Sequence, residues 1–187
     1  MDFHLNSEQK AFADAVGKFA EKELAPGALE RAHSPEYPWA IAQKISAQGL
    51  LGITFSEKDG GMGGTLMDAV IAIQEVALHC PKSADVVQAG NFGAIRTFVE
   101  YASDAQKEKY LPDLLAGKKI LGLGMSEPGA GSAVTELATS AKKVDGGYLI
   151  NGSKVFSTHS PEAGLFLVYV RFGPGLDGIG SVLVLSL

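Results

Sequence analysis

The segment from Gly124 to Ser132 has the residue types and spacing of a ligand-binding loop. Its sequence, GMSEPGAGS, follows an apolar stretch and passes through Ser-Glu-Pro into Gly-Ala-Gly-Ser. A turn of this composition exposes consecutive backbone amides and a hydroxyl, which suit an anionic diphosphate or the edge of a heterocycle. A tight connection that binds nothing can have the same composition. The residues alone leave both interpretations open.

Other sequence patterns that could indicate a metal, phosphate-binding or catalytic site lack the residue spacing that such sites need. The four histidines and the single Cys80 lack zinc-ligand spacing, so we predict no metal site. His79 and Cys80 are neighbours on a predicted helix and point in different directions, which disfavours a catalytic dyad. The stretch from Gly147 to Lys154 lacks the Lys-Ser/Thr order of a phosphate-binding P-loop. No G-x-S-x-G motif supports a hydrolase.

Composition narrows the class of protein. The chain has 187 residues, of which 46% are hydrophobic and 20% are charged, as in ordinary globular proteins. Its net charge of −5 disfavours nucleic acid as a partner. No apolar run approaches the roughly 20 residues of a membrane span, and the acidic start Met1–His4 is unlike a secretory signal. A single cysteine cannot form an internal disulfide, so we predict a cytoplasmic location.

Five helices with short loops are predicted in the first part of the chain, residues 1–117, which we interpret as a helical domain. His33 is placed in a polar loop between the first two. The first predicted helix begins at a capping box from Asn6 to Gln9 and ends at Pro26-Gly27. The second begins at Pro38, the third at an N-terminal signature from Thr65 to Asp68, and the fourth runs from about Ala84 to Tyr101. The fifth begins at a cap from Ser103 to Gln106 and ends at Gly117.

After Gly117 the apolar period changes from 3.6 to 2, which predicts a β-domain over 118–187. Asp145-Gly146-Gly147 and Asn151-Gly152 predict hairpin turns. Helices followed by strands indicate a segregated α+β fold, here with an antiparallel sheet. The last predicted strand reaches Leu187, so we expect the sheet to continue in a longer chain or a partner. The predicted strands are 120–125, 137–144, 148–150, 154–158, 165–170 and 182–187.

Two of these segments resemble conserved motifs of the acyl-CoA dehydrogenases, flavoproteins that oxidise acyl-CoA thioesters. Leu123–Ser132 (LGMSEPGAGS) is similar to the family's [TS]-E-P-x-A-G-S-D loop. Tyr148–Thr158 (YLINGSKVFST) is similar to its Y-x-x-N-G-x-K-x-W-I-T stretch. Gly49–Gly64 and Tyr110–Gly117 resemble two further family segments, in the family's order. The resemblance covers essentially the whole chain.

The resemblance implies an N-terminal helical domain, a middle β-domain that is incomplete here, and a C-terminal helical bundle that the chain does not reach. It implies FAD as the cofactor and a role in fatty acid metabolism. The implied reaction converts an acyl-CoA to the 2,3-enoyl-CoA by α-proton abstraction and β-hydride transfer to flavin N5, with the redox chemistry carried by the cofactor. The implied partners are an electron-transfer flavoprotein-like acceptor and further copies or a chain that supplies the C-terminal half.

The resemblance also implies a set of site residues. Phe156 stacks near the flavin ring where the family often has Trp, and the Thr158 hydroxyl lies near N5. Ser132 touches the flavin diphosphate or the pantetheine arm, so it is the expected substrate-binding residue. The full cofactor set is Leu123, Gly124, Met125, Ser126, Gly131, Ser132, Phe156, Ser157 and Thr158.

The chain departs from the family pattern at three points. Ala133 replaces the usual Asp after Gly-Ser, and Ser157–Ser160 replaces the usual I-T-N-G. The family's base is a Glu of the C-terminal bundle, so no catalytic residue is assigned here. Glu127 is interpreted as a structural acceptor.

Two alternatives stay open. A non-catalytic fragment or partner subunit is favoured by the absent base and by Ala133, and disfavoured by the retained Ser126, Ser132 and Thr158. A relative with different flavin chemistry, such as hydroxylation or nitroalkane oxidation, is the other. Under any of these readings we expect the isolated chain to self-associate, because a terminal apolar strand and an unpartnered helical face are exposed.

Overall fold

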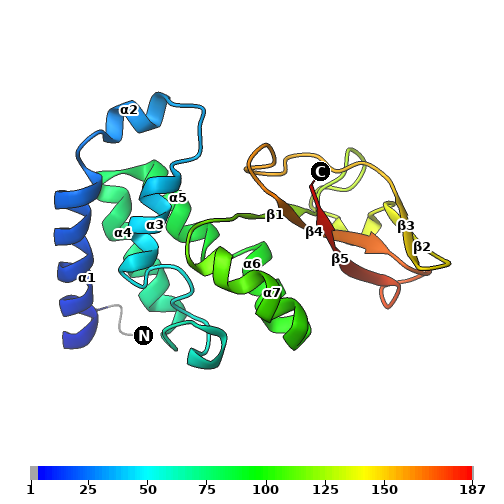
Figure 1. Ribbon diagram of the computed structural model, residues 1–187, viewed down its shortest axis with the longest axis horizontal. Helices are drawn as coiled ribbons and strands as arrows, with labels where there is room; N and C mark the ends of the chain where they lie inside the picture. The colour runs from blue at the N-terminus through cyan, green and yellow to red at the C-terminus, as the bar shows by residue number, and fades with distance from the viewer. Residues whose placement is uncertain (1–3, 187) are drawn as a thin grey trace. The chain divides into compact units, whose positions relative to one another are not determined.

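The computed structural model of the chain describes residues 4–186. The chain divides into two compact units, Met1–Lys119 and Ile120–Leu187, which run from blue to green and from green to red in Figure 1. The first unit is helical and the second contains the strands, so the predicted order of a helical domain and a β-domain is confirmed. The acidic start at residues 1–3 and the last residue of the strand predicted at 182–187 lie outside the described residues.

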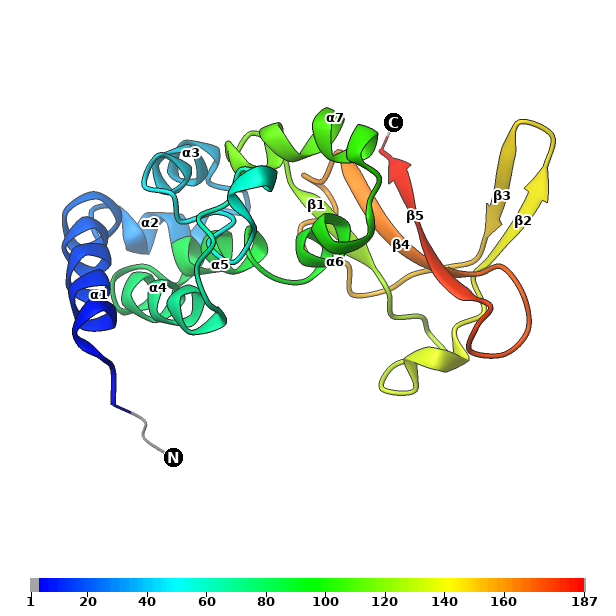
Figure 2. The same ribbon diagram turned by 90° about the horizontal axis from the view of Figure 1, so that it is seen from below.

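Helices of moderate length build the first unit. Helix α1 lies beside α4 in both views (Figures 1 and 2). No helix within residues 4–186 is long and apolar enough to cross a membrane. The α-helices are α1 (Ser7–Phe19), α2 (Ala28–His33), α3 (Trp39–Ala47), α4 (Leu66–His79), α5 (Pro81–Ala89), α6 (Ala94–Tyr101) and α7 (Asp104–Leu115), with a π-helical turn at Ala20–Leu24 and a 3-10 turn at Glu57–Asp59.

Three helices begin at the caps that the sequence predicts. Asn6 Oδ1 accepts from the Gln9 amide at 2.8 Å at the start of α1. The Thr65 hydroxyl accepts from the Asp68 amide at 3.2 Å at the start of α4, and Ser103 forms the same kind of box with Gln106 before α7. Each cap satisfies amides that the first helical turn leaves without partners.

The helix predicted from Ala84 to Tyr101 is wrong as a single element, because the chain breaks it into α5 and α6. Gly93 has a φ of +67°, which an α-helix does not accommodate. The buried Asn91 fixes the break: its side-chain amide donates to the carbonyls of Leu50 at 2.9 Å and Val87 at 2.8 Å. Its Oδ1 accepts from the Ile53 amide at 2.6 Å.

A short helix, α2, occupies residues for which the sequence predicts a polar loop, so the loop placement of His33 is wrong. The six residues of α2, ALERAH, show no apolar periodicity that would indicate a helix. None of them is buried in the structure. Arg31 fastens it to the end of the preceding helical turn by donating to the carbonyls of Pro26 (2.8 Å) and Leu24.

The core of each unit is apolar and lies where the periodic residues face inward. In the helical unit the largest fully buried apolar side chains come from the π-helical turn, from α3, α4, α5 and α6, and from the segment before Glu57; they are Leu24, Ile45, Ile53, Val76, Val87 and Phe98. In the sheet unit the buried side chains include Leu137, Ala141, Leu165, Leu167 and Val170.

The sheet unit is built around β4 (Leu165–Arg171). On one side β4 pairs with β1 (Leu121–Gly124), and its last residue meets the start of β2 (Ser140–Val144). On its other side it pairs with β5 (Ile179–Leu185) over its whole length. Strand β3 (Gly147–Asn151) pairs with β2, and this hairpin extends away from the rest of the sheet (Figure 2).

The sheet is mixed, whereas the sequence predicts an antiparallel one. The pairs β1–β4 and β2–β4 are parallel, and the pairs β2–β3 and β4–β5 are antiparallel. Parallel strands need a long crossover connection, and here it is the 40-residue stretch from β1 to β4 that contains the β2–β3 hairpin.

One predicted hairpin is confirmed and one predicted strand is wrong. Asp145-Gly146 connects β2 and β3, with Gly146 at a φ of +78°, a conformation that glycine adopts without steric cost. Asn151-Gly152 ends β3 and forms no second hairpin, and residues 154–158 form no strand. Phe156 has a φ of +56°, which lies outside the extended region, so the segment turns there instead.

Candidate functional site

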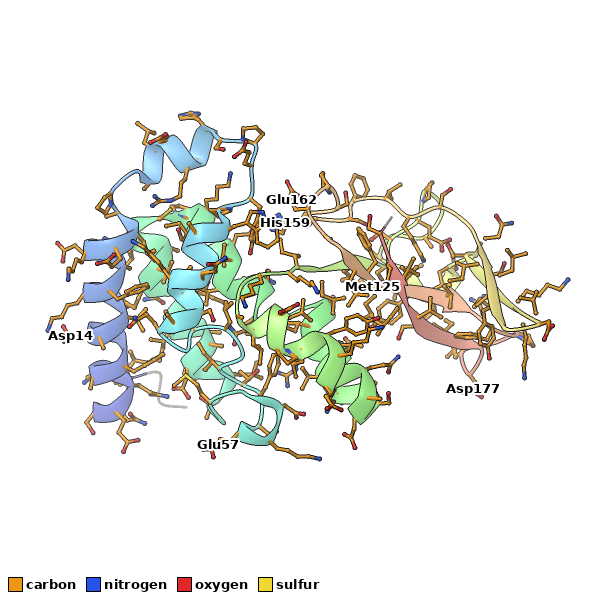
Figure 3. All side chains as sticks on the ribbon, in the orientation of Figure 1. Asp14, Glu57, Met125, His159, Glu162 and Asp177 are labelled. Atoms are coloured by element: carbon orange, nitrogen blue, oxygen red, sulfur yellow. The ribbon has the colours of Figure 1, made fainter. Side chains whose placement is uncertain are left out.

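Strand β1 delivers the candidate loop to the edge of the sheet. Leu123 and Gly124 pair in register with Leu167 and Val168 of β4. Beyond the strand, Glu127 and Ala130 exchange two backbone hydrogen bonds of 3.0 and 3.1 Å, which close a tight turn over Pro128-Gly129. Figure 3 labels Met125, the residue that directly follows β1.

The two predicted motifs meet at this point. The amide of Val155 donates to the carbonyl of Ser126 at 2.9 Å. Lys154 Nζ donates to the carbonyl of Met125 at 3.1 Å. The structure therefore brings the Leu123–Ser126 part of the candidate set next to the residues that precede Phe156, although the two stretches are far apart in sequence.

Glu127 anchors the loop from inside the unit. Only 8% of its surface is exposed, and its carboxylate accepts from the amides of Ala138 at 2.7 Å and Thr139 at 2.9 Å and from Lys154 Nζ at 2.7 Å. Burial alone would raise the pKa of Glu127, but the hydrogen bonds from Lys154, Thr139 and Ala138 outweigh it and lower the pKa from 4.5 to about 2. The carboxylate is thus a permanent acceptor, as the sequence interpretation holds, and is poorly suited to take up a substrate proton at neutral pH.

Phe156 is presented to the outside on a strained backbone. Its side chain is 93% exposed, and its φ of +56° is an outlier for a bulky residue, costing about 1–3 kcal/mol. Thr158 is also exposed, and Ser157 is half-buried. A turn follows in which the carbonyl of His159 accepts from the amides of Glu162 and Ala163; His159 and Glu162 are labelled in Figure 3.

The remaining candidates lie after the tight turn. Gly131 and Ser132 are exposed, and a Cβ added at Gly131 would meet nothing within 4 Å. Their backbone is therefore open to a ligand, whereas Gly124 is buried inside the sheet. Ala133 follows them and is also exposed.

Lys154 is the functional candidate that sequence reasoning missed. It belongs to the YLINGSKVFST stretch, but no role is predicted for it from the sequence. The signal was a lysine directly before Val-Phe, in a stretch that otherwise carries no charge. Its partner could not be found without the fold, because Glu127 lies 27 residues earlier.

A buried thiol lies between α4 and α5 in the helical unit. Cys80 is 1% exposed and is free. Burial opposes its ionisation, but hydrogen bonds from the Ser83 hydroxyl (3.1 Å) and Arg31 (3.6 Å) outweigh burial and lower the pKa of the thiol. Among the residues that the structure describes, no cluster of three or more His, Cys, Asp or Glu side chains has the arrangement of a metal site.

Comparisons with known proteins identify both units. The family model described as acyl-CoA dehydrogenase, N-terminal domain, matches residues 6–118, and that of the middle domain of acyl-CoA dehydrogenase matches residues 122–186. A short-chain-specific acyl-CoA dehydrogenase of Clostridium acetobutylicum is 32% identical over 186 residues, which are 98% of this chain and 49% of that protein.

Two solved structures extend the comparison. Butyryl-CoA dehydrogenase from Megasphaera elsdenii is 31% identical with a TM-score of 0.83, and the match covers 99% of this chain and 50% of that one. PigA with FAD and proline is 26% identical with a TM-score of 0.89, covering 99% and 49%. The chain spans about half the length of the curated relatives that it matches.

Proposed function

The chain belongs to the acyl-CoA dehydrogenase family, and we propose that it carries the flavin-binding half of a site that oxidises an acyl-CoA thioester to the 2,3-enoyl-CoA with FAD. The observation that carries the proposal is the junction of two motifs. The loop after β1 is hydrogen-bonded to the segment that presents Phe156 and Thr158. Relatives with FAD support the choice of cofactor.

The exposed groups at this junction fit a flavin. Phe156 offers an aromatic face that is almost wholly accessible, and Thr158 offers an exposed hydroxyl two residues later. The backbone of Leu123, Met125 and Ser126 lies on the adjacent strand end, where amides and carbonyls can meet the polar edge of the ring. Gly131 and Ser132 supply open amides and a hydroxyl for a diphosphate, or for the pantetheine arm of the substrate. Gly124, which is buried inside the sheet, and the half-buried Ser157 complete the proposed set.

When bound, the flavin would supply the electron-accepting chemistry, and the chain would supply position and polarity. Amide and hydroxyl donors held by a sheet are fixed before the ligand arrives, so they can stabilise developing charge without rearranging. No residue here is assigned as the base, and Glu127 is excluded from that role by its low pKa and its three donors. The base is proposed to lie in the part of the relatives that this chain does not match.

The proposed partners follow from the same reaction. They are an acyl-CoA, a flavoprotein that accepts electrons, and further copies of this chain or a chain that supplies the remaining half of the site. The proposed setting is fatty acid metabolism, and the cytoplasmic location stays a prediction from the cysteine content.

The first test is a visible absorption spectrum of the purified chain with added FAD, followed by a series of acyl-CoAs. We expect the chain to retain flavin, and the flavin to bleach with one of them. The double variant Ser132→Ala/Thr158→Val is expected to bind FAD at least tenfold more weakly, because it removes two proposed contacts. Unchanged flavin affinity in that variant would contradict the assignment, and a chain that refuses FAD would favour the non-catalytic alternative.

A second candidate function is flavin-dependent oxidation of a substrate that is not a thioester. The similarity to PigA with FAD and proline favours it, because that relative of the same fold is named with an amino acid. Proline is therefore included as a further arm of the titration. Bleaching by proline with no response to any acyl-CoA would replace the thioester proposal with this one.

A further inference from the structure

Lys154 and Glu127 form a buried ion pair at the junction of the two motifs. Their charged atoms are 2.7 Å apart, and the side chains are only 12% and 7% exposed. Charges in such surroundings are tolerated when they are paired and hydrogen-bonded. The pair meets that condition, because Glu127 has two amide donors besides Lys154 and Lys154 has a carbonyl acceptor besides Glu127.

The pair connects three segments that the chain does not join locally. Glu127 belongs to the loop after β1, and its amide donors belong to Ala138 and Thr139, directly before β2. Lys154 belongs to the stretch after β3, and its ammonium reaches back to Met125 and Glu127. A Cβ added at Gly124 would lie 3.4 Å from Lys154 Cγ, so the lysine stem lies against the end of β1.

We propose that Lys154, through its pair with Glu127, is a positioning residue that holds the loop after β1 and the Phe156–Thr158 segment in the register that a flavin requires. The inference rests on the proposed function, because it assigns a purpose to a register only if both segments contact the cofactor. Lys154 itself contacts no ligand in this assignment.

The strained backbone at Phe156 is the reason that the Lys154–Glu127 ion pair is needed. Phe156 comes two residues after Lys154 and has a backbone conformation that a bulky residue does not adopt on its own. A strained conformation persists only where its surroundings fix it. If Lys154 is replaced by an uncharged residue, the hydrogen bond from the Val155 amide to the Ser126 carbonyl still joins the two segments. The buried carboxylate of Glu127 then has no positive charge beside it.

The test compares Lys154→Met with Lys154→Arg, in the full chain. Methionine keeps most of the stem and removes the charge and donors, whereas arginine keeps a charge and can donate to two acceptors. Lys142→Met on β2 is the matched control, since Lys142 is exposed on the same sheet. The double variant Glu127→Gln/Lys154→Met avoids a buried unpaired charge if Lys154→Met alone folds poorly.

Two readouts distinguish positioning from general stability. The first is the hydrogen exchange rate of the Val155 amide in the chain without flavin, which we expect to rise at least tenfold in Lys154→Met and the double variant. The second is the FAD dissociation constant together with the visible circular dichroism of the bound flavin. We expect the constant to rise at least tenfold and the spectrum to change, with Lys154→Arg restoring most of both and Lys142→Met resembling the parent chain.

The outcomes separate this inference from the proposed function. If the parent chain takes up no FAD, the proposed function fails and the positioning role fails with it. If the parent chain binds FAD and the methionine variants bind it with the same affinity and spectrum, the positioning inference alone is overturned. An unchanged hydrogen exchange rate of the Val155 amide in Lys154→Met would also overturn the positioning inference, because the ion pair would then not stabilise the contact between the two segments.

Discussion

Glu127 is kept ionised by its neighbours in spite of its burial. Removing a carboxylate from water favours its neutral form, but two backbone amides and an ammonium group each favour the charged form. The balance lowers the pKa to about 2. A residue of this kind contributes to stability through proton linkage, because the unfolded chain binds a proton at a pH where the folded chain does not.

The stability contributed by Glu127 is expected to disappear in acid. Its pKa is lower in the folded chain than the ordinary value of 4.5, so the contribution is fully present above about pH 5 and is lost as the pH falls towards 2. A shift of this size corresponds to about 3 kcal/mol. Urea unfolding of the parent chain and of Glu127→Gln between pH 7 and pH 2 would measure it.

The difference in unfolding free energy between the parent chain and Glu127→Gln isolates the effect of Glu127, because the other carboxylates titrate in both proteins. We expect the parent chain to be the more stable at pH 7 and the two unfolding free energies to converge in acid. A difference that stays constant across the range would mean that Glu127 keeps an ordinary pKa in the folded chain.

At the scale of elements, the end of β3 is fixed by close contact with the start of β2. Gly152 has a φ of +154°, and a Cβ there would lie 2.4 Å from Thr139 Oγ1 and 2.6 Å from Thr139 Cα. Thr139 is buried and donates its amide to Glu127. A side chain at 152 would therefore push on the residue that anchors the candidate loop.

Gly152→Ala is expected to lower the free energy of unfolding by about 1–3 kcal/mol, the usual cost of overpacking a filled site. Gly147→Ala, at the other end of β3, is the matched control, because a Cβ there meets nothing within 4 Å. Denaturant unfolding of both variants gives the comparison. Equal stabilities would show that β2 and the Asn151-Gly152 corner separate easily.

The elements that the sequence predicts well are those whose signals are local. A capping box such as Asn6 with Gln9, or the Asp145-Gly146 turn, is complete within four residues, and each is found where it is predicted. At the split of α5 from α6, Asn91 bonds to Leu50, 41 residues earlier; just before the turn at Phe156, Lys154 bonds to Met125, 29 residues earlier. Neither contact is visible in the local pattern, so the predicted long helix and the predicted strand at 154–158 are wrong.

The candidate site shows the same division. Its residue types and order identify two motifs, and the resemblance to a family gives their roles as proposals. They meet through hydrogen bonds between residues that lie 27 to 29 positions apart, from Val155 and Lys154 back to Met125, Ser126 and Glu127. Periodicity predicts strands but not their partners, so the contact between Lys154 and Met125 needed the fold.

At the scale of the whole molecule, both units expose large apolar side chains. They include Leu66, Met67, Val70 and Leu78 on α4 and Val144, Tyr148 and Leu149 on the β2–β3 hairpin, each at least 45% exposed. Groups of apolar side chains at a surface are typical of faces that contact another protein. These exposed apolar side chains support the proposed oligomer.

We expect the chain to self-associate reversibly, and sedimentation velocity over a range of concentrations would measure it. Leu149→Glu places a charge on the hairpin and is expected to weaken the association, while Gln88→Glu, at an exposed position of α5, controls for one added negative charge. A clean monomer at tens of micromolar would contradict the prediction.

The crossover between β1 and β4 also sets an order of events during folding. The four residues of β1 pair only with β4, which begins 40 residues later, among the strands that the structure describes. Closing such a loop lowers the chain entropy before any strand contact forms to compensate, so non-local pairing is slow. On a ribosome the helical unit emerges before β4, so we expect it to fold first. The sheet is expected to be completed only after β4 and β5 have been made.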